Sequence, residues 1–208
     1  MRGPFPVRFA RSRDPRLPSG ILVSDPVRLP DPSGALARLG PGGAVHLRLY
    51  GMPAAEAARV QARVLGAARR ARVRVVLARD SQPAALPRTL GGIHLPEALA
   101  LGRLPLARLL LWRRAAPERT LCMATHNARA LGRARSLGAD YVLLSPMFPT
   151  RSHPGAPVLG AVRAALLARQ AGVPVYALGG VTPRTVRRLP PGTFRGVAGI
   201  DTFTLPGA

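Results

Sequence analysis

The chain has 208 residues, a length that suits one domain with a sizeable core or a single α/β barrel. All 31 basic residues are arginine, and the absence of lysine excludes Schiff-base lysine chemistry and a standard phosphate-loop NTPase. The single cysteine, Cys122, excludes an intramolecular disulfide and an all-cysteine metal site.

Short apolar segments alternate with alanine- and arginine-rich segments along the chain. The apolar segments predict eight strands, over residues 20–24, 44–50, 73–78, 92–95, 120–124, 141–145, 174–178 and 196–200. The intervening segments predict helices, most clearly over residues 53–71, 127–137, 157–171 and 183–189. This alternation indicates an α/β protein with a (β/α)8 TIM barrel. An open doubly wound sheet is the alternative, although eight parallel strands are many for this length.

Two regions fit a barrel less well. Residues 102–117 are rich in leucine but are interrupted by Pro105, and only eight residues follow the last predicted strand, so the final barrel helix is expected to be short or missing. The resulting gap is expected to be covered by the N-terminal segment or by a partner subunit in a homo-oligomer, or to stay uncovered. For residues 1–19 themselves we predict a flexible basic segment, which precedes a single domain over residues 20–208.

The formal net charge is +22, and alanine, arginine, glycine, proline and leucine dominate the composition. We attribute much of the charge to this compositional bias, with a nucleic-acid surface as the alternative. Aromatic residues make up only 4%, no zinc-finger spacing is present, and arginine pairs at 69–70, 113–114 and 187–188 fall on predicted outer helix faces. We therefore expect no nucleic-acid partner beyond non-specific binding at low salt.

No apolar run approaches the roughly 20 residues that span a bilayer. The first 20 residues also lack an apolar core of signal-peptide length. These observations predict a cytoplasmic protein without a membrane partner.

The strand predicted over residues 44–50 alternates apolar and polar side chains. Its apolar face would pack against the outer helices, so His46, Arg48 and Tyr50 are expected to face the barrel interior. A buried arginine needs an anionic partner. For Arg48 that partner is either a ligand phosphate or a carboxylate such as Asp25 or Asp80.

All four histidines fall in predicted strands or in the loops that follow them: His46, His94, His126 and His153. Functional groups of α/β barrels gather at the C-terminal ends of the strands. We therefore expect the histidines at the barrel mouth.

The segment DYVLLSPMFPTRSHPGAPVLG, residues 140–160, begins as a buried strand and continues as a loop rich in hydrogen-bond donors. Thr150, Arg151, Ser152 and His153 follow the proline that ends the strand. Hydroxyls and a guanidinium suit a phosphorylated ligand. The alternative is a rigid, proline-rich surface loop with incidental polar residues.

Glycines follow the last two predicted strands, at Gly179, Gly180 and Gly199. The loops at these positions commonly form a phosphate site from backbone N–H groups, and glycine permits a close approach. Glycine is also ordinary turn punctuation after a strand.

Over residues 20–203 the chain resembles the thiamine phosphate synthase / TenI family. The resemblance rests on ILVSDP at 21–26, GIHL at 92–95, ATHN at 124–127, the segment 138–160 and PVYALGGVTP at 174–183. The family fold is the (β/α)8 barrel. Its synthase members join an aminopyrimidine pyrophosphate to a thiazole phosphate with magnesium and release pyrophosphate.

The resemblance implies a thiazole-phosphate site that is largely kept. The hydroxyls of Thr150 and Ser152 would hold the phosphate, with Arg151 between them. The other thiazole-phosphate positions that the resemblance implies are in backbone-binding loops, at Gly179, Gly180, Gly199 and Ile200. Asp201 is also among them and stands where a serine is typical.

The pyrimidine-pyrophosphate side departs from the family pattern. Of the family's Gln-x-Arg-x-Lys strand only Arg48 remains, between His46 and Tyr50. Arg79 occupies a magnesium-ligand position, and His153 replaces the lysine of the opening loop.

The metal positions implied by the resemblance are degraded as well. Leu99 aligns near the second metal aspartate, where Glu97 is the only nearby carboxylate, and Ala124 replaces a serine. We expect no metal or other cofactor, with Asp80 as the one candidate ligand and Mg²⁺ needed only for the synthase reaction.

His126 matches a histidine that the TenI branch uses for proton transfer in tautomerising a thiazole carboxylate phosphate, work that suits imidazole. Synthases commonly carry histidine there too. We favour a thiazole tautomerase, an isomerase with His126 as general acid/base. The alternatives are a thiamine phosphate synthase, which is a transferase, and a non-catalytic or regulatory barrel that binds the phosphate ligand.

Overall fold

Eight parallel strands close into a barrel in the computed structural model, which describes residues 9–10, 14–78, 91–102, 106–152 and 154–204. Each strand pairs with the next one along the chain, and β1 pairs with β8 to close the sheet. The strands are β1 Ile21–Val23, β2 Ala44–Arg48, β3 Arg74–Ala78, β4 Gly92–Leu95, β5 Thr120–Thr125, β6 Tyr141–Leu144, β7 Val175–Leu178 and β8 Gly196–Gly199. All eight lie within two residues of the predicted bounds, and the (β/α)8 TIM barrel is confirmed.

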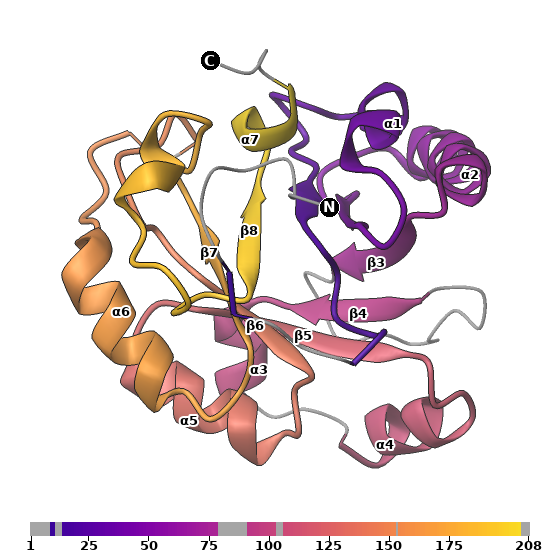
Figure 1. The fold of residues 1–208 in the computed structure, drawn as a ribbon. Helices are drawn as coiled ribbons and strands as arrows, with labels where there is room; N and C mark the ends of the chain where they lie inside the picture. Colours follow the sequence, from indigo (N-terminus) through magenta and orange to yellow (C-terminus); the bar gives the residue numbers. More distant parts are fainter. Residues whose placement is uncertain (1–8, 11–13, 79–90, 103–105, 153, 205–208) are drawn as a thin grey trace.

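Helices surround the strands on the outside of the barrel (Figure 1). They are η1 Ser33–Ala35, α1 Leu36–Leu39, α2 Ala54–Ala71, α3 Glu97–Leu101, α4 Leu106–Arg114, α5 Ala128–Ser136, α6 Gly160–Gln170, η2 Thr185–Arg188 and α7 Asp201–Thr204. The final helix, α7, is short, as predicted, with four residues. The sequence did not delimit α1 and α3, which are four and five residues long, or α4, which starts directly after Pro105. No helix in the described part of the chain is long and apolar enough to cross a membrane.

The strand side chains form two separate apolar groups, one on each face of the closed sheet. Leu47 and Leu121 point outward and pack with the helices. Ile21, Tyr141 and Tyr176 point inward and fill the barrel. This period-two alternation is what the sequence of residues 44–50 predicts.

Residues 14–19 lie against the N-terminal ends of the strands and close the bottom of the barrel. Leu17 is 7% exposed and belongs to the apolar group inside the barrel. The Tyr176 hydroxyl donates a hydrogen bond to the carbonyl oxygen of Pro18, and Arg74 donates to the carbonyl oxygen of Arg16. Residues 14–19 are therefore packed against the barrel, because Leu17 covers apolar surface that the strands alone leave open. The flexibility of residues 1–19 stays a prediction.

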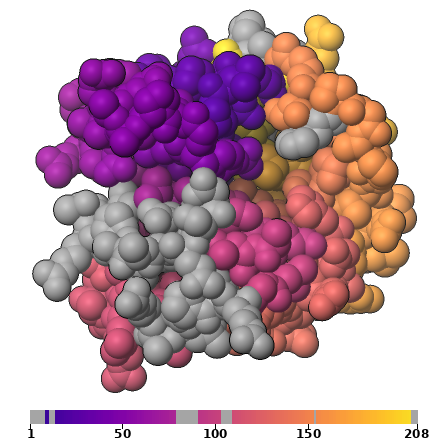
Figure 2. All heavy atoms as spheres, turned by 180° about the vertical axis from the view of Figure 1, so that it is seen from behind, coloured from indigo at the N-terminus to yellow at the C-terminus, as the bar shows by residue number. Residues whose placement is uncertain are grey.

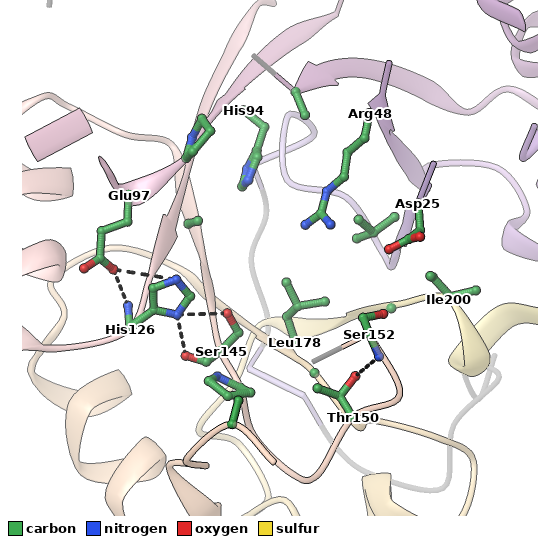
Figure 3. A pocket seen from close by; sticks show the side chains of 18 of the residues that line it. Asp25, Arg48, His94, Glu97, His126, Ser145, Thr150, Ser152, Leu178 and Ile200 are labelled. Carbon is green, nitrogen blue, oxygen red and sulfur yellow. Dashed lines mark hydrogen bonds and ion pairs between the residues drawn. The ribbon is translucent and has the colours of Figure 1, made fainter. Parts of the chain in front are cut away.

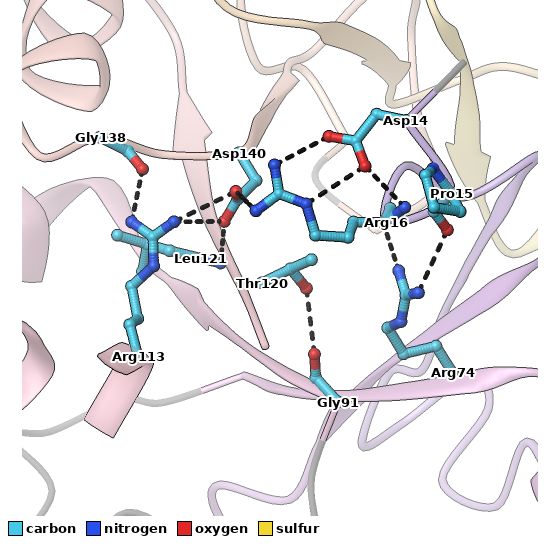
Figure 4. A network of polar contacts seen from close by, with 10 residues as sticks. All are labelled: Asp14, Pro15, Arg16, Arg74, Gly91, Arg113, Thr120, Leu121, Gly138 and Asp140. Atoms are coloured by element: carbon cyan, nitrogen blue, oxygen red, sulfur yellow. Dashed lines mark hydrogen bonds and ion pairs between the residues drawn. The ribbon is translucent and has the colours of Figure 1, made fainter. Parts of the chain in front are cut away.

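An ion-pair network ties this closing segment to the barrel (Figure 4). The Asp140 carboxylate, with a side chain 5% exposed, pairs with Arg16 at 3.1 Å and with Arg113 at 3.0 Å. It also accepts a hydrogen bond from the backbone N–H of Leu121 at 2.8 Å. Arg16 in turn donates to Asp14, and these hydrogen bonds lower the pKa of the Asp14 carboxyl. Arg16 thereby links the segment through Asp140 to Arg113 of α4 and to Leu121 of β5.

Candidate active site

A cavity of 820 Å³ opens at the C-terminal ends of the strands. The space-filling view shows a hollow between the violet, magenta and orange parts of the chain (Figure 2). Every strand contributes to its wall, within or directly after its last residues: Val23, Arg48, Ala78, His94, Ala124, Ser145, Leu178 and Gly199. This is the end of the barrel at which the fold places functional groups.

His126 lies on the wall of this cavity, directly after β5, with a half-exposed side chain. Its Nδ1 lies 2.8 Å from the carbonyl oxygen of Ser145 and 3.2 Å from the Ser145 hydroxyl (Figure 3). A carbonyl oxygen only accepts, so Nδ1 carries the hydrogen and the neutral ring presents an unprotonated Nε2. The ring is therefore oriented for proton exchange through one defined nitrogen.

Glu97, the first residue of α3, stands beside this histidine. Its carboxylate accepts hydrogen bonds from the backbone N–H of His126 at 2.7 Å and from the Asn127 side chain at 3.1 Å. Glu97 Oε2 also lies 4.0 Å from Nε2 of His126. From the sequence, Glu97 was predicted only as a replacement metal ligand. Its hydrogen-bond partners directly follow β5, about 30 residues further along the chain, so the local sequence pattern does not reveal them.

The side chains predicted to hold a phosphate gather on the opposite wall. Thr150, Ser152 and Ile200 line the cavity, and the Ser152 N–H donates to the Thr150 hydroxyl at 3.3 Å. Gly179 and Gly180 line it too, with φ of +89° and +65°. A Cβ on Gly180 would collide with the carbonyl oxygens of Phe148 and Pro149, so this loop needs glycine for its conformation and for its packing.

Asp201 joins two arginines at this wall. Its Oδ1 accepts from Arg28 at 2.6 Å and from Arg151 at 2.8 Å. Arg28 also donates to the Ser152 hydroxyl at 3.0 Å. Arg28 was missed by the sequence analysis, although a cation in the loop after the first strand satisfies the same positional rule. Arg151 lies outside the cavity wall, with a side chain 68% exposed.

Arg48 and Tyr50 line the cavity on the side of β2. The Arg48 guanidinium points into the cavity and makes no hydrogen bond or ion pair with any residue that the structure describes (Figure 3). Asp25, one proposed partner, accepts instead from the backbone N–H groups of Val27 and Arg28. Arg79, Asp80 and His153, also named by the sequence analysis, lie outside the described residues.

The expectation that all histidines stand at the mouth is wrong for His46. This residue is fully buried, below the cavity, and its Nε2 lies 2.9 Å from the Tyr141 hydroxyl. His94 borders the cavity from below, with Nδ1 3.2 Å from Cys122 Sγ. His46 lies in the middle of β2 and Arg48 at its end. The two residues are consecutive on the same face of the strand, so His46 lies inside the barrel and Arg48 at its mouth.

Burial governs the protonation of this inner group. It lowers the pKa of His46 well below the ordinary value and that of His94 to about 3, with the charge of Arg48 acting in the same direction. It raises the pKa of the Cys122 thiol and of the Tyr141 hydroxyl. Both imidazoles are therefore neutral at pH 7.

The described carboxylates at the mouth do not fit the magnesium ion of the synthase reaction. Magnesium requires several oxygen ligands around one octahedral position. Asp25, Glu97 and Asp201 line the cavity, but each is engaged by backbone amides or by an arginine or asparagine side chain. Ala78 offers no ligand at the end of β3.

The fold and the cavity define a (β/α)8 barrel protein with a pocket at the C-terminal mouth, whose wall carries several polar side chains and an oriented histidine. The sequence model of the family described as thiamine monophosphate synthase matches residues 33–203, most of the chain. The chain belongs to this thiamine monophosphate synthase / TenI family.

Individual relatives agree with this assignment. A thiamine-phosphate synthase from Methylobacillus flagellatus is 32% identical over 144 residues, which are 69% of this chain and 65% of that protein. One from Thermosynechococcus vestitus is 33% identical over 105 residues, 50% of this chain and 28% of that protein. The chain thus spans less than two thirds of the length of these relatives.

Solved structures share the architecture. A thiamine phosphate pyrophosphorylase from Pyrococcus furiosus matches with a TM-score of 0.66 at 20% identity, over 88% of this chain and 85% of its own. A 2-keto-3-deoxy-6-phospho-gluconate aldolase from Zymomonas mobilis matches with a TM-score of 0.56 at 18% identity, over 89% and 84%. Such likeness shows the fold alone, and the reaction has to be argued from the residues of the site.

Proposed function

We propose that this protein is an isomerase that tautomerises a phosphorylated thiazole carboxylate, with His126 as the acid/base. The observation that carries the proposal is the fixed orientation of His126 on the cavity wall. Its Nδ1 is held by the Ser145 carbonyl oxygen, and Glu97 lies 4.0 Å from Nε2. The described carboxylates that line the mouth are engaged by backbone amides or by an arginine or asparagine side chain.

The proposed reaction moves one proton within the substrate, so the product has the same atoms as the substrate. The lone pair of His126 Nε2 takes a proton from the substrate ring, and the His126 imidazole becomes an imidazolium. The carboxylate of Glu97 stabilises that charge, while the Ser145 carbonyl oxygen continues to accept from Nδ1–H. Nε2 then returns the proton to a different atom of the substrate, which completes the isomerisation.

The two ends of the cavity suit the two anionic groups of such a substrate. Thr150, Ser152 and the N–H groups of the Gly179–Gly180 loop provide donors for the phosphate. Arg48 provides a guanidinium without a partner among the described residues, which suits the carboxylate. In this proposal the ligand lies across the cavity, between β2 and the loops that follow β6 and β7.

The proposal is tested with His126→Asn. We expect the tautomerisation rate, followed by ring-proton exchange in deuterated water, to fall by about 10²–10⁴-fold. Thiazole phosphate affinity, measured by calorimetry, should stay within about twofold, because the phosphate wall is untouched. Full isomerase activity in His126→Asn would overturn the assignment.

A synthase is the second candidate, and the relatives named thiamine-phosphate synthase support it. Incubating the protein with aminopyrimidine pyrophosphate, thiazole phosphate and Mg²⁺ separates the two. Pyrophosphate release that stops on addition of chelator favours the synthase. If neither reaction occurs while thiazole phosphate still raises the melting temperature, a binding or regulatory role is favoured.

A further inference from the structure

Three metal-binding side chains meet inside the barrel, below the cavity. His46 of β2, His94 of β4 and Cys122 of β5 each place a nitrogen or sulfur atom within 4.8 Å of the others. All three side chains are buried. They point inward from three strands, so the closed sheet brings together residues that are up to 76 positions apart in the chain.

The hydrogen bonds of this group leave one strong polar atom without a partner. His94 Nδ1 contacts Cys122 Sγ at 3.2 Å, and His46 Nε2 contacts the Tyr141 hydroxyl at 2.9 Å. His46 Nδ1 is buried and has no hydrogen-bond partner among the described residues. A buried polar nitrogen without a partner is unfavourable, so a ligand for it is expected.

We propose that His46, His94 and Cys122 bind one divalent transition-metal ion of the zinc class. Two imidazoles and one thiolate are the donors that zinc prefers, whereas magnesium and calcium prefer oxygen. In this arrangement His46 binds through Nδ1, and its Nε2–H donates to the Tyr141 hydroxyl, which fixes the ring as partners of metal-bound histidines commonly do.

The observed spacing is close to what one ion requires. Metal–nitrogen distances of about 2.0 Å and metal–sulfur distances of about 2.3 Å at tetrahedral angles put ligand atoms about 3.3–3.6 Å apart. The contact between His94 Nδ1 and Cys122 Sγ, at 3.2 Å, is close to the lower end of this range. The ligand atoms of the three residues all lie within 4.8 Å of one another, so the side chains would have to close by up to roughly 1 Å around the ion.

The charges and the access route are also consistent with an ion. Arg48 lies near both imidazoles and repels a cation, but binding converts the Cys122 thiol to a thiolate, which offsets part of that repulsion. His94 lines the cavity, so an ion can enter from the mouth. Three protein ligands leave a fourth position, as in zinc sites that also bind water or substrate.

The site is separate from the proposed acid/base, because His126 is not one of the three ligands. The ion would therefore bind whether or not the tautomerase assignment holds. This separation also provides a matched control, since His126→Asn removes a histidine from the same barrel without touching the cluster.

The test uses the full chain, treated with chelator, dialysed and titrated with Co²⁺ and then with Zn²⁺. We expect one Co²⁺ per chain, a sulfur-to-cobalt charge-transfer absorption, and displacement of that absorption by Zn²⁺. Zinc should also raise the melting temperature in proportion to the logarithm of its concentration.

The variants locate the ligands. Cys122→Ser should abolish the charge-transfer absorption, His46→Asn should weaken binding by more than about 100-fold, and Tyr141→Phe by about 10–100-fold. His126→Asn should bind like the wild type, and far-ultraviolet circular dichroism confirms folding of each variant. The proposal is overturned if wild-type protein shows no stoichiometric binding, or if a folded His46→Asn variant binds cobalt unchanged. If Cys122→Ser does not fold, the His46→Asn result decides.

Discussion

Asp201 places a negative charge between two arginines at the wall where a phosphate is expected. Its Oδ1 accepts from Arg28 and from Arg151, so the carboxylate engages Arg28, the guanidinium at the cavity wall that a ligand phosphate would otherwise use. We predict that Asp201→Ser tightens the binding of thiazole phosphate and of inorganic phosphate by about fivefold, which corresponds to the ~1 kcal/mol repulsion between like charges close together in water.

Calorimetric titration measures this effect. Asp31→Ser is the matched control, because Asp31 pairs with Arg63 on the outside of the molecule. The prediction is wrong if Asp201→Ser weakens phosphate binding, which would mean that the carboxylate orients the two arginines and does not compete with the ligand.

At the level of secondary-structure elements, Asn127 makes two separate contacts at the start of α5. Its Oδ1 accepts from the Ala130 N–H and caps α5, while its Nδ2 donates to Glu97 beside His126. Asn127→Ala should lower the free energy of unfolding by about 1 kcal/mol, whereas Asn127→Ser keeps a capping acceptor and should stay close to wild type. Both variants lose the Glu97 contact, so both should reduce turnover in the proposed isomerase reaction by about tenfold.

Urea unfolding and turnover measured on the same preparations distinguish the roles of the two contacts. Equal stability losses in Asn127→Ala and Asn127→Ser would contradict the capping role. Unchanged turnover in both would show that Glu97 does not need Asn127 to hold His126.

The closing segment, residues 14–19, is an element that strand and helix patterns do not describe. Leu17 inserts into the bottom of the barrel, and its truncation leaves a cavity there. We predict that Leu17→Ala lowers the free energy of unfolding by about 2–4 kcal/mol, measured by urea titration. Leu111→Ala on α4, where the side chain is 67% exposed, should change it by less than about 0.5 kcal/mol. Equal effects of the two variants would mean that the segment does not support the barrel.

The net charge of +22 acts at the scale of the whole molecule. We predict that duplex DNA binds at about 20 mM salt, with an affinity that falls steeply as salt rises and is lost near 150 mM, because the interaction rests on counterion release alone. Fluorescence anisotropy across a salt series measures it. Submicromolar binding that persists at 150 mM salt would instead indicate a dedicated nucleic-acid surface.

The barrel itself was predictable from the sequence because each buried strand is short, apolar and bounded by helix or turn signals. The alternation at residues 44–50 also assigned side chains to the two faces of the sheet, since the pleat has a strict period of two. The period of two does not predict how far along the barrel axis a side chain lies. His46 and Arg48 share a face, yet the register of the strands puts His46 below the cavity and Arg48 within it.

The sequence by itself therefore determined the fold class, the family and the loops that line the mouth, since local hydrophobic patterns and short motifs indicate each of them. Only the tertiary structure decided which side chains meet. Arg28 reaches Asp201 across 173 residues, Glu97 reaches the N–H of His126 across 29, and Cys122 meets His94 across 28. These pairings depend on barrel closure and strand register, which set distances that no single segment of the chain encodes.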